Sequence, residues 1–285
     1  MLLYAQKYID QNDIVYSCDM LRFKLQFKED LIEEVVKKFG SYERLDVTIY
    51  PLCTAPFKFR HLLKIDYNLS SATLGIGFNG CDRDSMFDGF YEVNPNKCIR
   101  VDQCIEDIQY IFACCWSVEL IRWDLAVDIP VRRDLVHLVK DQRTYSTVRQ
   151  SVENFTEYLG QMDKVGRVKV YNKTIESNLL DDITRVEVTL PDLYNKLEFN
   201  KLFPKVKIQS FQSSLAFNDL KLTDTDKVLV ELLREVENPD YYLKRLGRNK
   251  REKLTEYVYH DCEELHFNLP FIFSLYNYYK QLLCF

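Results

Sequence analysis

The stretch Gly166-Arg167-Val168-Lys169-Val170-Tyr171-Asn172-Lys173-Thr174-Ile175-Glu176 decides how the chain is interpreted. Apolar and polar residues alternate along it with a period of two, which predicts a β-strand running into a turn. The two valines would face a core, and both lysines would share the opposite face with Tyr171. A phenol between two ammonium groups, with a carboxylate just beyond, is unusual for a solvent-facing strand. It is the arrangement that a tyrosine attacking a phosphate would require.

Two further stretches alternate in the same way. In the predicted strand from 119 to 130, one face would carry Arg122, Asp124, Ala126 and Asp128, and the other Ile121, Trp123, Leu125, Val127 and Ile129. In the predicted strand from 184 to 190, one face would carry Arg185, Glu187 and Thr189, with Val186, Val188 and Leu190 packed behind it. If the three strands are neighbours in one antiparallel sheet, their polar side chains converge on one exposed surface.

Such a surface would have the chemistry for phosphodiester cleavage. Carboxylates from Asp124, Asp128 and Glu187 suit a hard divalent ion, Mg²⁺ or Mn²⁺, which polarises a phosphodiester oxygen. A free phenol has a pKa of about 10, so it needs nearby cations such as Lys169 and Lys173 to react as a phenolate at neutral pH. For any one of these strands, a simple solvated face remains the alternative.

The remaining pattern predicts an α+β fold: a mainly antiparallel sheet with flanking helices over residues 1–215, followed by a small all-helical region over 216–285. Strands are expected at 17–27 and around 47–50, 57–67 and 73–78. Helices are expected at 28–39, 101–115, 131–140, 224–236, 248–262 and 271–283. The helical region carries a basic cluster that is either a DNA recognition helix or a solvated helix face: Lys244, Arg245, Arg248, Lys250, Arg251 and Lys253.

The composition narrows the class of protein. The chain of 285 residues has a net charge of −5, which counts against a nucleic-acid partner without excluding one, because local patches decide phosphate affinity. Its nine cysteines are odd in number and include no CxxC, which argues against a disulfide framework or a zinc ribbon. No signal peptide and no membrane-spanning run is expected, and we predict a cytoplasmic protein.

Two motifs are interpreted as structural. The stretch Gly75-Ile76-Gly77-Phe78-Asn79-Gly80 matches the dinucleotide pattern GxGxxG, but no helix or βαβ unit follows it, so a strand ending in a turn is expected. The residues His260, Asp261, Cys262 and His266 are of types that can bind zinc. On the predicted helix, however, their spacing does not supply a fourth ligand, so a structural role is expected.

At these residues the sequence resembles the replication initiation factor family, the rolling-circle initiators of Gram-positive plasmids and related filamentous-phage replication proteins. The resemblance spans roughly residues 75–190 and rests on five motifs in the family's order. They are Gly77-Phe78-Asn79-Gly80-Cys81, the R-x-D-x-A-x-D strand at 122–128, Thr156-Glu157-Tyr158-Leu159-Gly160, the Y-N-K-x-x-E segment at 171–176, and Arg185-Val186-Glu187.

The resemblance implies that Tyr171 nicks one DNA strand through a 5′-phosphotyrosine link, frees a 3′-OH as primer and later rejoins the strand. It assigns Asp124, Asp128 and Glu187 to Mg²⁺ or Mn²⁺. It makes Lys173 and Glu176 helpers of the tyrosine, a role that the strand pattern also gives to Lys169. DNA binding is expected at Arg122 and Arg185 and, from the sequence pattern of the tail alone, at Lys244, Arg245, Arg248, Lys250 and Arg251. The DNA partner would be an origin nick site, either single-stranded or in an extruded hairpin. A host helicase and a polymerase would be the protein partners, and the chain could form a homodimer. No membrane partner is expected. The His-hydrophobic-His metal pair of many other rolling-circle nickases is absent, which fits a carboxylate-based branch.

Two alternatives stay open. Tyr158 is a rival nucleophile, although its sequence neighbours Glu157 and Leu159 provide no cation. The chain could also be a DNA-binding or regulatory module on the same scaffold that has lost its chemistry. The presence of all four residues Asp124, Asp128, Tyr171 and Glu187 favours the enzyme.

Overall fold

The computed structural model describes residues 6–40, 59–67, 70–78, 88–98, 102–150, 154–162, 164–192, 200–209, 222–236, 239–258 and 262–281. These residues form an α+β fold, a mainly antiparallel sheet with flanking helices, which confirms the predicted fold class. The chain divides into two compact units, described separately below. Within the described ranges no helix has the length and apolarity needed to cross a membrane.

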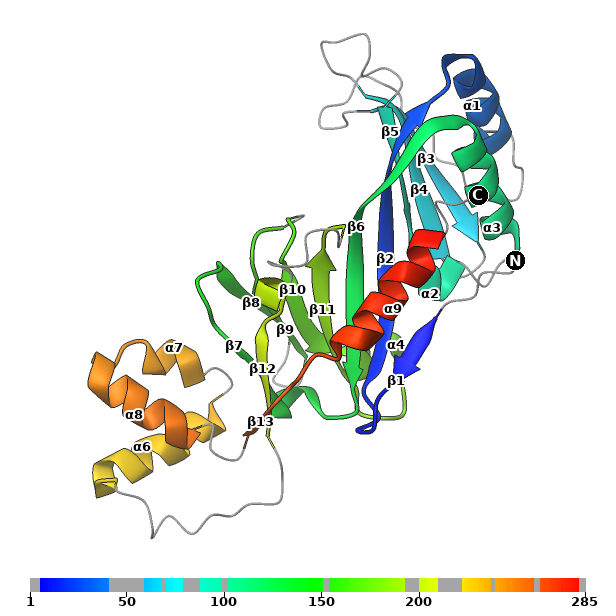
Figure 1. Cartoon of the computed structure of the whole chain (residues 1–285). Helices are drawn as coiled ribbons and strands as arrows, with labels where there is room; N and C mark the ends of the chain where they lie inside the picture. The colour runs from blue at the N-terminus through cyan, green and yellow to red at the C-terminus, as the bar shows by residue number, and fades with distance from the viewer. Residues whose placement is uncertain are drawn as a thin grey trace. The chain divides into compact units, whose positions relative to one another are not determined.

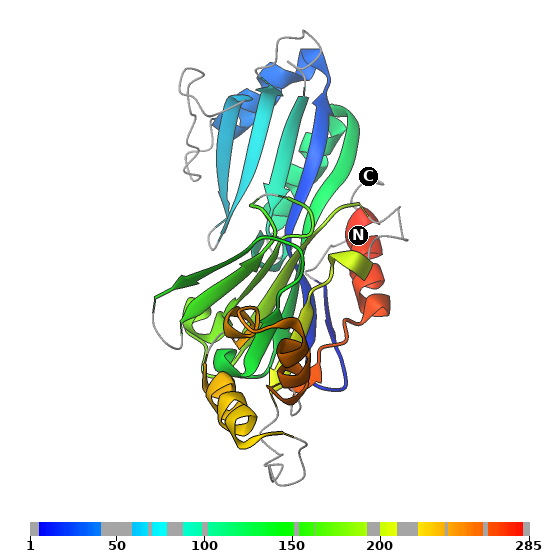
Figure 2. The ribbon, with the colours of Figure 1, turned by 90° about the vertical axis from the view of Figure 1, so that its left-hand side faces the viewer.

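The first unit comprises Met1–Val127, Glu187–Phe199 and Asn268–Phe285. Its strands are β1 (Lys7–Ile9), β2 (Val15–Phe27), β3 (Phe59–Tyr67), β4 (Ser70–Phe78), β5 (Asp88–Val93), most of β6 (Cys115–Ile129) and the end of β11 (Thr184–Leu190). Its helices are η1 (Glu29–Leu31), α1 (Ile32–Gly40), α2 (Pro95–Cys98), α3 (Asp102–Ala113) and α9 (Leu269–Lys280). The strands follow the order β3-β4-β5-β2-β6, with β1 paired to β2. In Figure 2 the light-blue and cyan strands β3, β4 and β5 are followed by β2 in dark blue and β6 in green.

The core of this unit follows from the alternation in β2. Every second residue from Leu21 to Phe27 is buried, whereas Lys24 and Gln26 between them are exposed. Phe23 packs edge-on against Phe112 of α3, with ring centroids 5.0 Å apart. The predicted helices at 28–39 and 101–115 are present as η1 with α1 and as α3. The strand expected around 47–50 lies outside the described residues.

Helix α9 belongs to the first unit, although the sequence pattern grouped it with the helical tail. Phe271 stacks on Tyr8 of β1 at 5.2 Å and meets Tyr16 of β2 edge-on at 5.9 Å. The hydroxyl of Tyr279 accepts a hydrogen bond from the backbone N–H of Gln6 at 3.1 Å. Figure 1 shows α9 in red alongside β2 in blue. The aromatic residues of the last helix therefore complete a core begun by the first strands.

The GxGxxG stretch forms a strand that packs closely against a glycine of the neighbouring strand. Gly75 and Gly89 lie on the paired strands β4 and β5. A Cβ added to Gly89 would stand 2.4 Å from the carbonyl oxygen of Gly75 and 2.6 Å from the Phe27 ring, which leaves no room for a side chain. Asn79 and Gly80 lie outside the described residues. The strand interpretation of residues 73–78 is confirmed.

A buried carboxylate in the first unit makes its stability depend on pH. The side chain of Asp107 is fully buried and accepts hydrogen bonds from the Tyr67 hydroxyl at 2.9 Å and the Gln103 amide at 3.1 Å. Burial raises the pKa of Asp107, although these two donors and the charge of Lys38 oppose the rise. The folded protein therefore holds this proton to a higher pH than the unfolded chain does.

We expect the Asp107→Asn variant to lose a pH-dependent part of the stability. Because the folded-state pKa is raised, wild-type stability should fall as pH rises from the unfolded value through the raised value. The slope of unfolding free energy against pH, measured in urea at several pH values, should be flatter in this window for the variant. Asp102→Asn, at the exposed start of the same helix, is the control and should keep the wild-type slope. Equal slopes for Asp107→Asn and wild type would contradict the assignment.

The second unit comprises Asp128–Val186 and Asn200–Phe267. Its strands are the end of β6, β7 (Val136–Val139), β8 (Tyr145–Arg149), β9 (Phe155–Leu159), β10 (Val168–Asn172), the start of β11, β12 (Lys205–Gln209) and β13 (Cys262–Glu264). Its helices are η3 (Arg133–Leu135), α4 (Lys173–Ser177), η4 (Asn200–Leu202), α6 (Asp224–Glu235), α7 (Pro239–Leu243) and α8 (Arg248–Val258). The strands β11, β10, β9 and β8 are neighbours in this order, and a separate three-stranded sheet has the order β13-β12-β7.

The helix predicted at 131–140 is wrong. Only the short turn η3 is helical, and β7 follows it, paired antiparallel to β12. Val136 and Leu138 are buried and alternate with half-buried residues, a period of two that the short segment left hidden. The all-helical prediction for 216–285 is also wrong at Cys262–Glu264, which forms β13.

Helices α6, α7 and α8 share a small apolar core made of Leu222, Val230, Leu233, Leu243, Leu254 and Val258. They appear together in yellow and orange in Figure 1. The two compact units do not follow a boundary at 215, because these helices group with β7–β10 while α9 groups with β2. The division into a nicking domain at 1–215 and a helical region at 216–285 remains a prediction about function.

Candidate active site

The stretch at 166–176 forms strand β10 followed by helix α4. Val168 and Val170 are fully buried, as the alternation predicted. The expected turn is instead a helical one, because the Asn172 side chain caps α4 by accepting a hydrogen bond from the backbone N–H of Ile175 at 3.0 Å. Lys173 and Glu176 are thereby brought onto one face of the helix, three residues apart.

Both ends of this strand–helix segment are held by long-range hydrogen bonds. At the start, Gly166 has φ +80°, and its carbonyl accepts from Arg143 Nη1 at 2.7 Å. After α4, the Thr174 hydroxyl donates to the Asp181 carbonyl at 2.7 Å and accepts from the Ile183 N–H at 2.7 Å. Arg143 therefore holds the start of the segment that carries Tyr171, and the Thr174 hydroxyl ties α4 to the residues that follow it.

Tyr171 lies against the two lysines that the alternation placed beside it. The ammonium of Lys169 lies 3.7 Å from the centroid of the Tyr171 ring, and that of Lys173 lies 5.9 Å from it. The expectation of an open polar face is wrong, however. Tyr171 is only 5% exposed, and Arg185, on the predicted polar face of β11, is 7% exposed. The phenol is thus surrounded by cations but largely covered.

Glu176 is the carboxylate of this cluster. Burial alone would raise the pKa of Glu176, but its hydrogen bond and charge interaction with Lys173, together with the charges of Lys169 and Arg185, hold the pKa below its usual value. Lys173 donates to this carboxylate in a direct ion pair. Glu176 is therefore ionised at neutral pH and acts as the common neighbour of the three cations.

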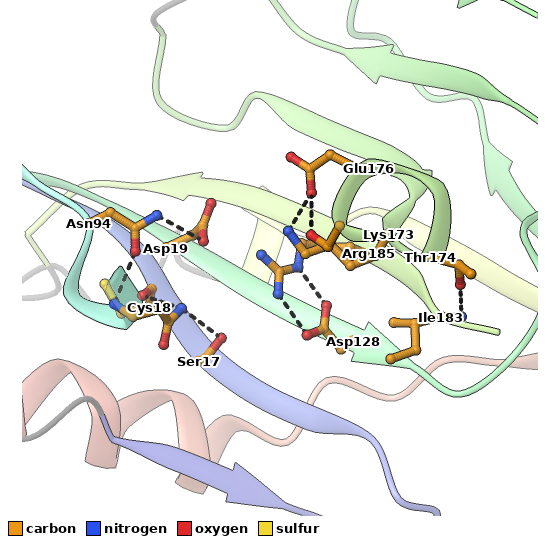
Figure 3. A network of polar contacts seen from close by, with 12 residues as sticks. Ser17, Cys18, Asp19, Asn94, Asp128, Lys173, Thr174, Glu176, Ile183 and Arg185 are labelled. Atoms are coloured by element: carbon orange, nitrogen blue, oxygen red, sulfur yellow. Dashed lines mark hydrogen bonds and ion pairs between the residues drawn. The ribbon is translucent and has the colours of Figure 1, made fainter. Parts of the chain in front are cut away.

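Arg185 and Asp128 form a second ion pair in the same unit, from β11 and the end of β6. Arg185 Nε donates to Asp128 Oδ1 at 2.5 Å, and Nη2 donates to Oδ2 at 2.7 Å. Two nitrogens of one guanidinium thus bind both oxygens of one carboxylate, beside the Lys173–Glu176 pair (Figure 3). The cluster of Lys169, Tyr171, Lys173, Glu176, Asp128 and Arg185 is called the Tyr171 cluster below.

Asp124 and Glu187 belong to the first unit. Asp124 accepts from Arg122 Nε at 3.1 Å on one oxygen and from Nη2 at 3.0 Å on the other. This pair follows from i,i+2 spacing on one strand face, so the sequence could have indicated it. Asp19 of β2, which the sequence pattern did not single out, acts with Asp124 on one buried thiol: after burial itself, both carboxylates raise the pKa of Cys18.

The described carboxylates do not fit a ready-made site for a divalent ion. Asp124 and Asp128 each use both oxygens to accept from a guanidinium, and a cation held there would repel a metal. Across the described ranges, no group of three or more His, Cys, Asp or Glu side chains has the arrangement to hold a metal ion. Mg²⁺ or Mn²⁺ at Asp124, Asp128 and Glu187 remains a prediction from the sequence, and no reaction step is derived through it.

Tyr158 has a more cationic environment than its sequence neighbours indicated. Lys169 is its cross-strand partner in the β9–β10 ladder. The guanidinium of Arg167 also lies 5.0 Å from the Tyr158 ring centroid. Tyr158, Lys169 and Tyr171 therefore share one face of this sheet, and the rival nucleophile keeps its place in the tests.

The basic cluster of the tail is partly used to hold helices together. Lys250 and Lys253 of α8 pair with Asp226 of α6 at 3.2 Å and 3.3 Å. Arg248 pairs with Glu252 one turn along α8. These three cations thus have structural partners, which weakens the prediction that α8 is a DNA recognition helix.

Six of the nine cysteines lie in the described residues. Cys18, Cys98, Cys104, Cys114, Cys115 and Cys262 are free, and all but Cys262 are buried.

No protein-family model matches the chain, and a search of curated protein sequences finds no match. Among solved structures, the chain is similar to the rolling-circle replication initiator protein from Geobacillus stearothermophilus. The identity is 17% and the TM-score 0.38, over 86% of this chain and 96% of that chain. The residue roles proposed below rest on the motifs of this chain and on its own geometry.

Proposed function

We propose that the chain is a rolling-circle replication initiator that nicks and rejoins DNA through Tyr171. The contact between the Tyr171 ring and Lys169, with Lys173 and Arg185 in the same cluster, carries this proposal. Three cations face two carboxylates there, Glu176 and Asp128, so the Tyr171 cluster keeps a positive charge that favours a phosphate.

In the proposed reaction, the Tyr171 oxygen attacks the phosphorus of one phosphodiester. A bond forms between phosphorus and the phenolic oxygen, and the bond to the 3′ oxygen of the preceding nucleotide breaks. The phenolic proton is lost and the 3′ oxygen gains one, so a 3′-OH and a 5′-phosphotyrosine result. Lys169 and Lys173 favour the phenolate, and the cations offset the charge that develops on the phosphoryl oxygens. The reverse attack by the 3′-OH reseals the strand.

The ion pair of Arg185 with Asp128 gives Arg185 a positioning role in this scheme. The carboxylate fixes the guanidinium plane through both of its hydrogen bonds. A fixed guanidinium needs little reorganisation when a phosphate approaches. Because Tyr171 is only 5% exposed, DNA binding must be accompanied by local movement that uncovers the phenol.

The same burial favours one alternative. A covered phenol, and carboxylates already paired with arginines, are also what a module that binds DNA without cutting it would have. This second candidate is a non-catalytic origin-binding or regulatory protein on the same scaffold.

A covalent adduct assay separates the two functions. The protein is incubated with a labelled pool of random single-stranded oligonucleotides, or with supercoiled DNA, in the presence of Mn²⁺ or Mg²⁺. We expect a labelled band that migrates with the protein after denaturation, and relaxation of the supercoiled DNA. Retarded DNA in a native gel, without any adduct, would support the non-catalytic module instead.

The metal prediction is tested in the same reaction. We expect EDTA to abolish adduct formation and added Mn²⁺ or Mg²⁺ to restore it, as a metal that stabilises phosphoryl charge requires. An adduct that forms equally well in EDTA would reject the metal while leaving the tyrosine chemistry in place.

A further inference from the structure

A row of alternating rings and cations joins the loop after β7 to helix α7 in the second unit. The ammonium of Lys140 lies 3.8 Å from the centroid of the Tyr145 ring and 5.7 Å from that of Tyr241. The guanidinium carbon of Arg245 lies 4.1 Å from the Tyr241 ring centroid, and the Tyr242 ring meets that of Tyr241 edge-on at 5.2 Å. These five residues are called the tyrosine–cation row.

The row is held in place by bonds within the protein. The backbone N–H of Lys140 donates to Asp240 Oδ2 at 3.1 Å, which ties the β7–β8 loop to the start of α7. The Tyr145 hydroxyl donates to Glu157 at 2.5 Å, and Arg245 donates to the Tyr241 hydroxyl. A ligand therefore meets an ordered surface and loses less conformational freedom when it binds.

The charge of this surface suits an anion. Lys140, Lys244 and Arg245 are cations, and Asp240 is an acid that acts on Lys140. Two further acids act on these lysines, but each has an arginine partner: Glu157, which acts on Lys140, pairs with Arg133, and Asp141, which interacts with Lys244, pairs with Arg143. Burial lowers the pKa of Lys140, Asp240 opposes that shift, and the neighbouring Lys244 adds to it. A phosphate therefore stabilises a partly dehydrated ammonium beside a second cation more strongly than it stabilises a fully hydrated ammonium.

The exposed rings indicate which anion. Tyr241 and Tyr242 are 45% and 47% exposed, large fractions for aromatic side chains on a short helix. Bases in a duplex already stack on one another, whereas bases of a single strand can stack on tyrosine rings or on a guanidinium plane. An acidic peptide would use the cations but would leave the rings without a partner.

We propose that the tyrosine–cation row, together with the neighbouring Lys244, binds single-stranded DNA. Bases would stack on Tyr242 and on the Arg245–Tyr241 pair, and Lys140 and Lys244 would hold phosphates. The assignment to DNA rests on the proposed function. The proposed binding site for single-stranded DNA lies on α7, the residues directly after it and the β7–β8 loop. Helix α8, which carries most of the basic sequence cluster, is not part of this site.

Equilibrium binding to the full-length chain tests the proposal. The probes are a fluorescein-labelled poly-dT oligonucleotide and a duplex of the same length, followed by anisotropy at several salt concentrations. Tyr242→Ala should weaken poly-dT binding about tenfold, the effect expected for one stacked base. Arg245→Gln should weaken it and lower the slope of log affinity against log salt by about 0.7.

Arg132→Gln is the matched control. It removes the same charge from an exposed arginine of the same unit that pairs with Asp134 and belongs neither to the row nor to the basic cluster. This variant should leave affinity within about twofold of wild type. Equal losses in Arg245→Gln and Arg132→Gln would overturn the proposal, as would wild-type affinity in a folded Tyr242→Ala variant. Stronger binding to the duplex, or equal displacement of poly-dT by poly-glutamate, would also overturn it.

The outcome is independent of nicking. Tyr171→Phe should bind poly-dT as the wild type does, since Tyr171 is not part of the row. Loss of adduct formation with intact poly-dT binding would therefore leave the binding proposal standing. Absence of any adduct in the wild type, with poly-dT binding lost in Tyr242→Ala, would reject the catalytic proposal alone. Normal adduct formation by Tyr242→Ala with unchanged poly-dT affinity would reject the binding proposal alone.

Discussion

Tyr171→Phe is expected to abolish formation of the covalent protein–DNA adduct. The substitution removes only the hydroxyl that would attack the phosphate and keeps the ring that packs beside Lys169. Removal of a covalent nucleophile lowers turnover on the order of 10⁶-fold, so no labelled adduct should be detected on a denaturing gel. DNA binding should be retained, because the cations of the Tyr171 cluster are unchanged.

Tyr158→Phe is the matched control for this prediction. Tyr158 lies opposite Lys169 on the neighbouring strand and beside Arg167, so it offers a second phenol in a cationic setting. Tyr158→Phe should form adduct at close to the wild-type rate. The reverse pattern, with adduct lost in Tyr158→Phe and kept in Tyr171→Phe, would transfer the nucleophile to β9. Both variants should unfold within about 1 kcal/mol of wild type, because each loses one hydroxyl.

Glu157→Gln is expected to cause the largest loss of stability among the substitutions considered. Glu157 accepts from the Arg133 guanidinium, and the two side chains are 5% and 1% exposed. The substituted amide would keep the shape of the side chain but leave the Arg133 charge without its counter-ion in the interior. Removal of one partner of a buried ion pair costs roughly 3–5 kcal/mol, so the midpoint of urea unfolding should fall markedly.

The surroundings of Arg133 leave little to compensate for that loss. Its Nη1 donates to the Val136 carbonyl at 2.6 Å and its guanidinium lies 4.0 Å from the Phe155 ring, but among the described residues Nε has no hydrogen-bond partner. The Tyr145 hydroxyl, which also donates to Glu157, would meet a weaker acceptor. A Glu157→Gln midpoint equal to that of wild type would show that the pair is not buried in solution.

Asp134→Asn is the exposed counterpart. Asp134 pairs with Arg132, the residue before Arg133. The Asp134 side chain is 40% exposed and the Arg132 side chain is 54% exposed. Exposed pairs contribute at most about 1 kcal/mol, so this variant should unfold close to wild type. The comparison separates the effect of burial from the effect of removing one carboxylate charge.

The placement of Tyr171 shows what local periodicity can predict. Side chains two residues apart on a strand lie on one face, so the sequence alone placed Lys169 beside Tyr171, and Lys173 followed at the strand's end. The same rule put Arg122 beside Asp124. The rule also predicted Val168 and Val170 in the core, because apolar residues on the other face gain most from burial.

Pattern failed where a segment was short or where partners came from distant parts of the chain. Val136–Val139 was predicted as helix because four residues are too few to separate a period of two from one of 3.6, and pairing with β12 decided the outcome. Arg185 and Asp128 are 57 residues apart, so their ion pair depends on how β11 and β6 are arranged. Lys140 and Tyr241 meet only because α7 packs near the β7–β8 loop.

The sequence by itself determined the α+β class, the strand that carries Tyr171 and the cations next to it, because alternation within a strand is a local property. Only the tertiary structure decided that Tyr171 is covered, that Asp128 is paired with Arg185, and that Tyr241 and Tyr242 stand exposed beside Lys140. Coverage and pairing depend on which distant elements pack together. Periodicity tells which side of a strand a residue takes, but it does not tell what lies on that side.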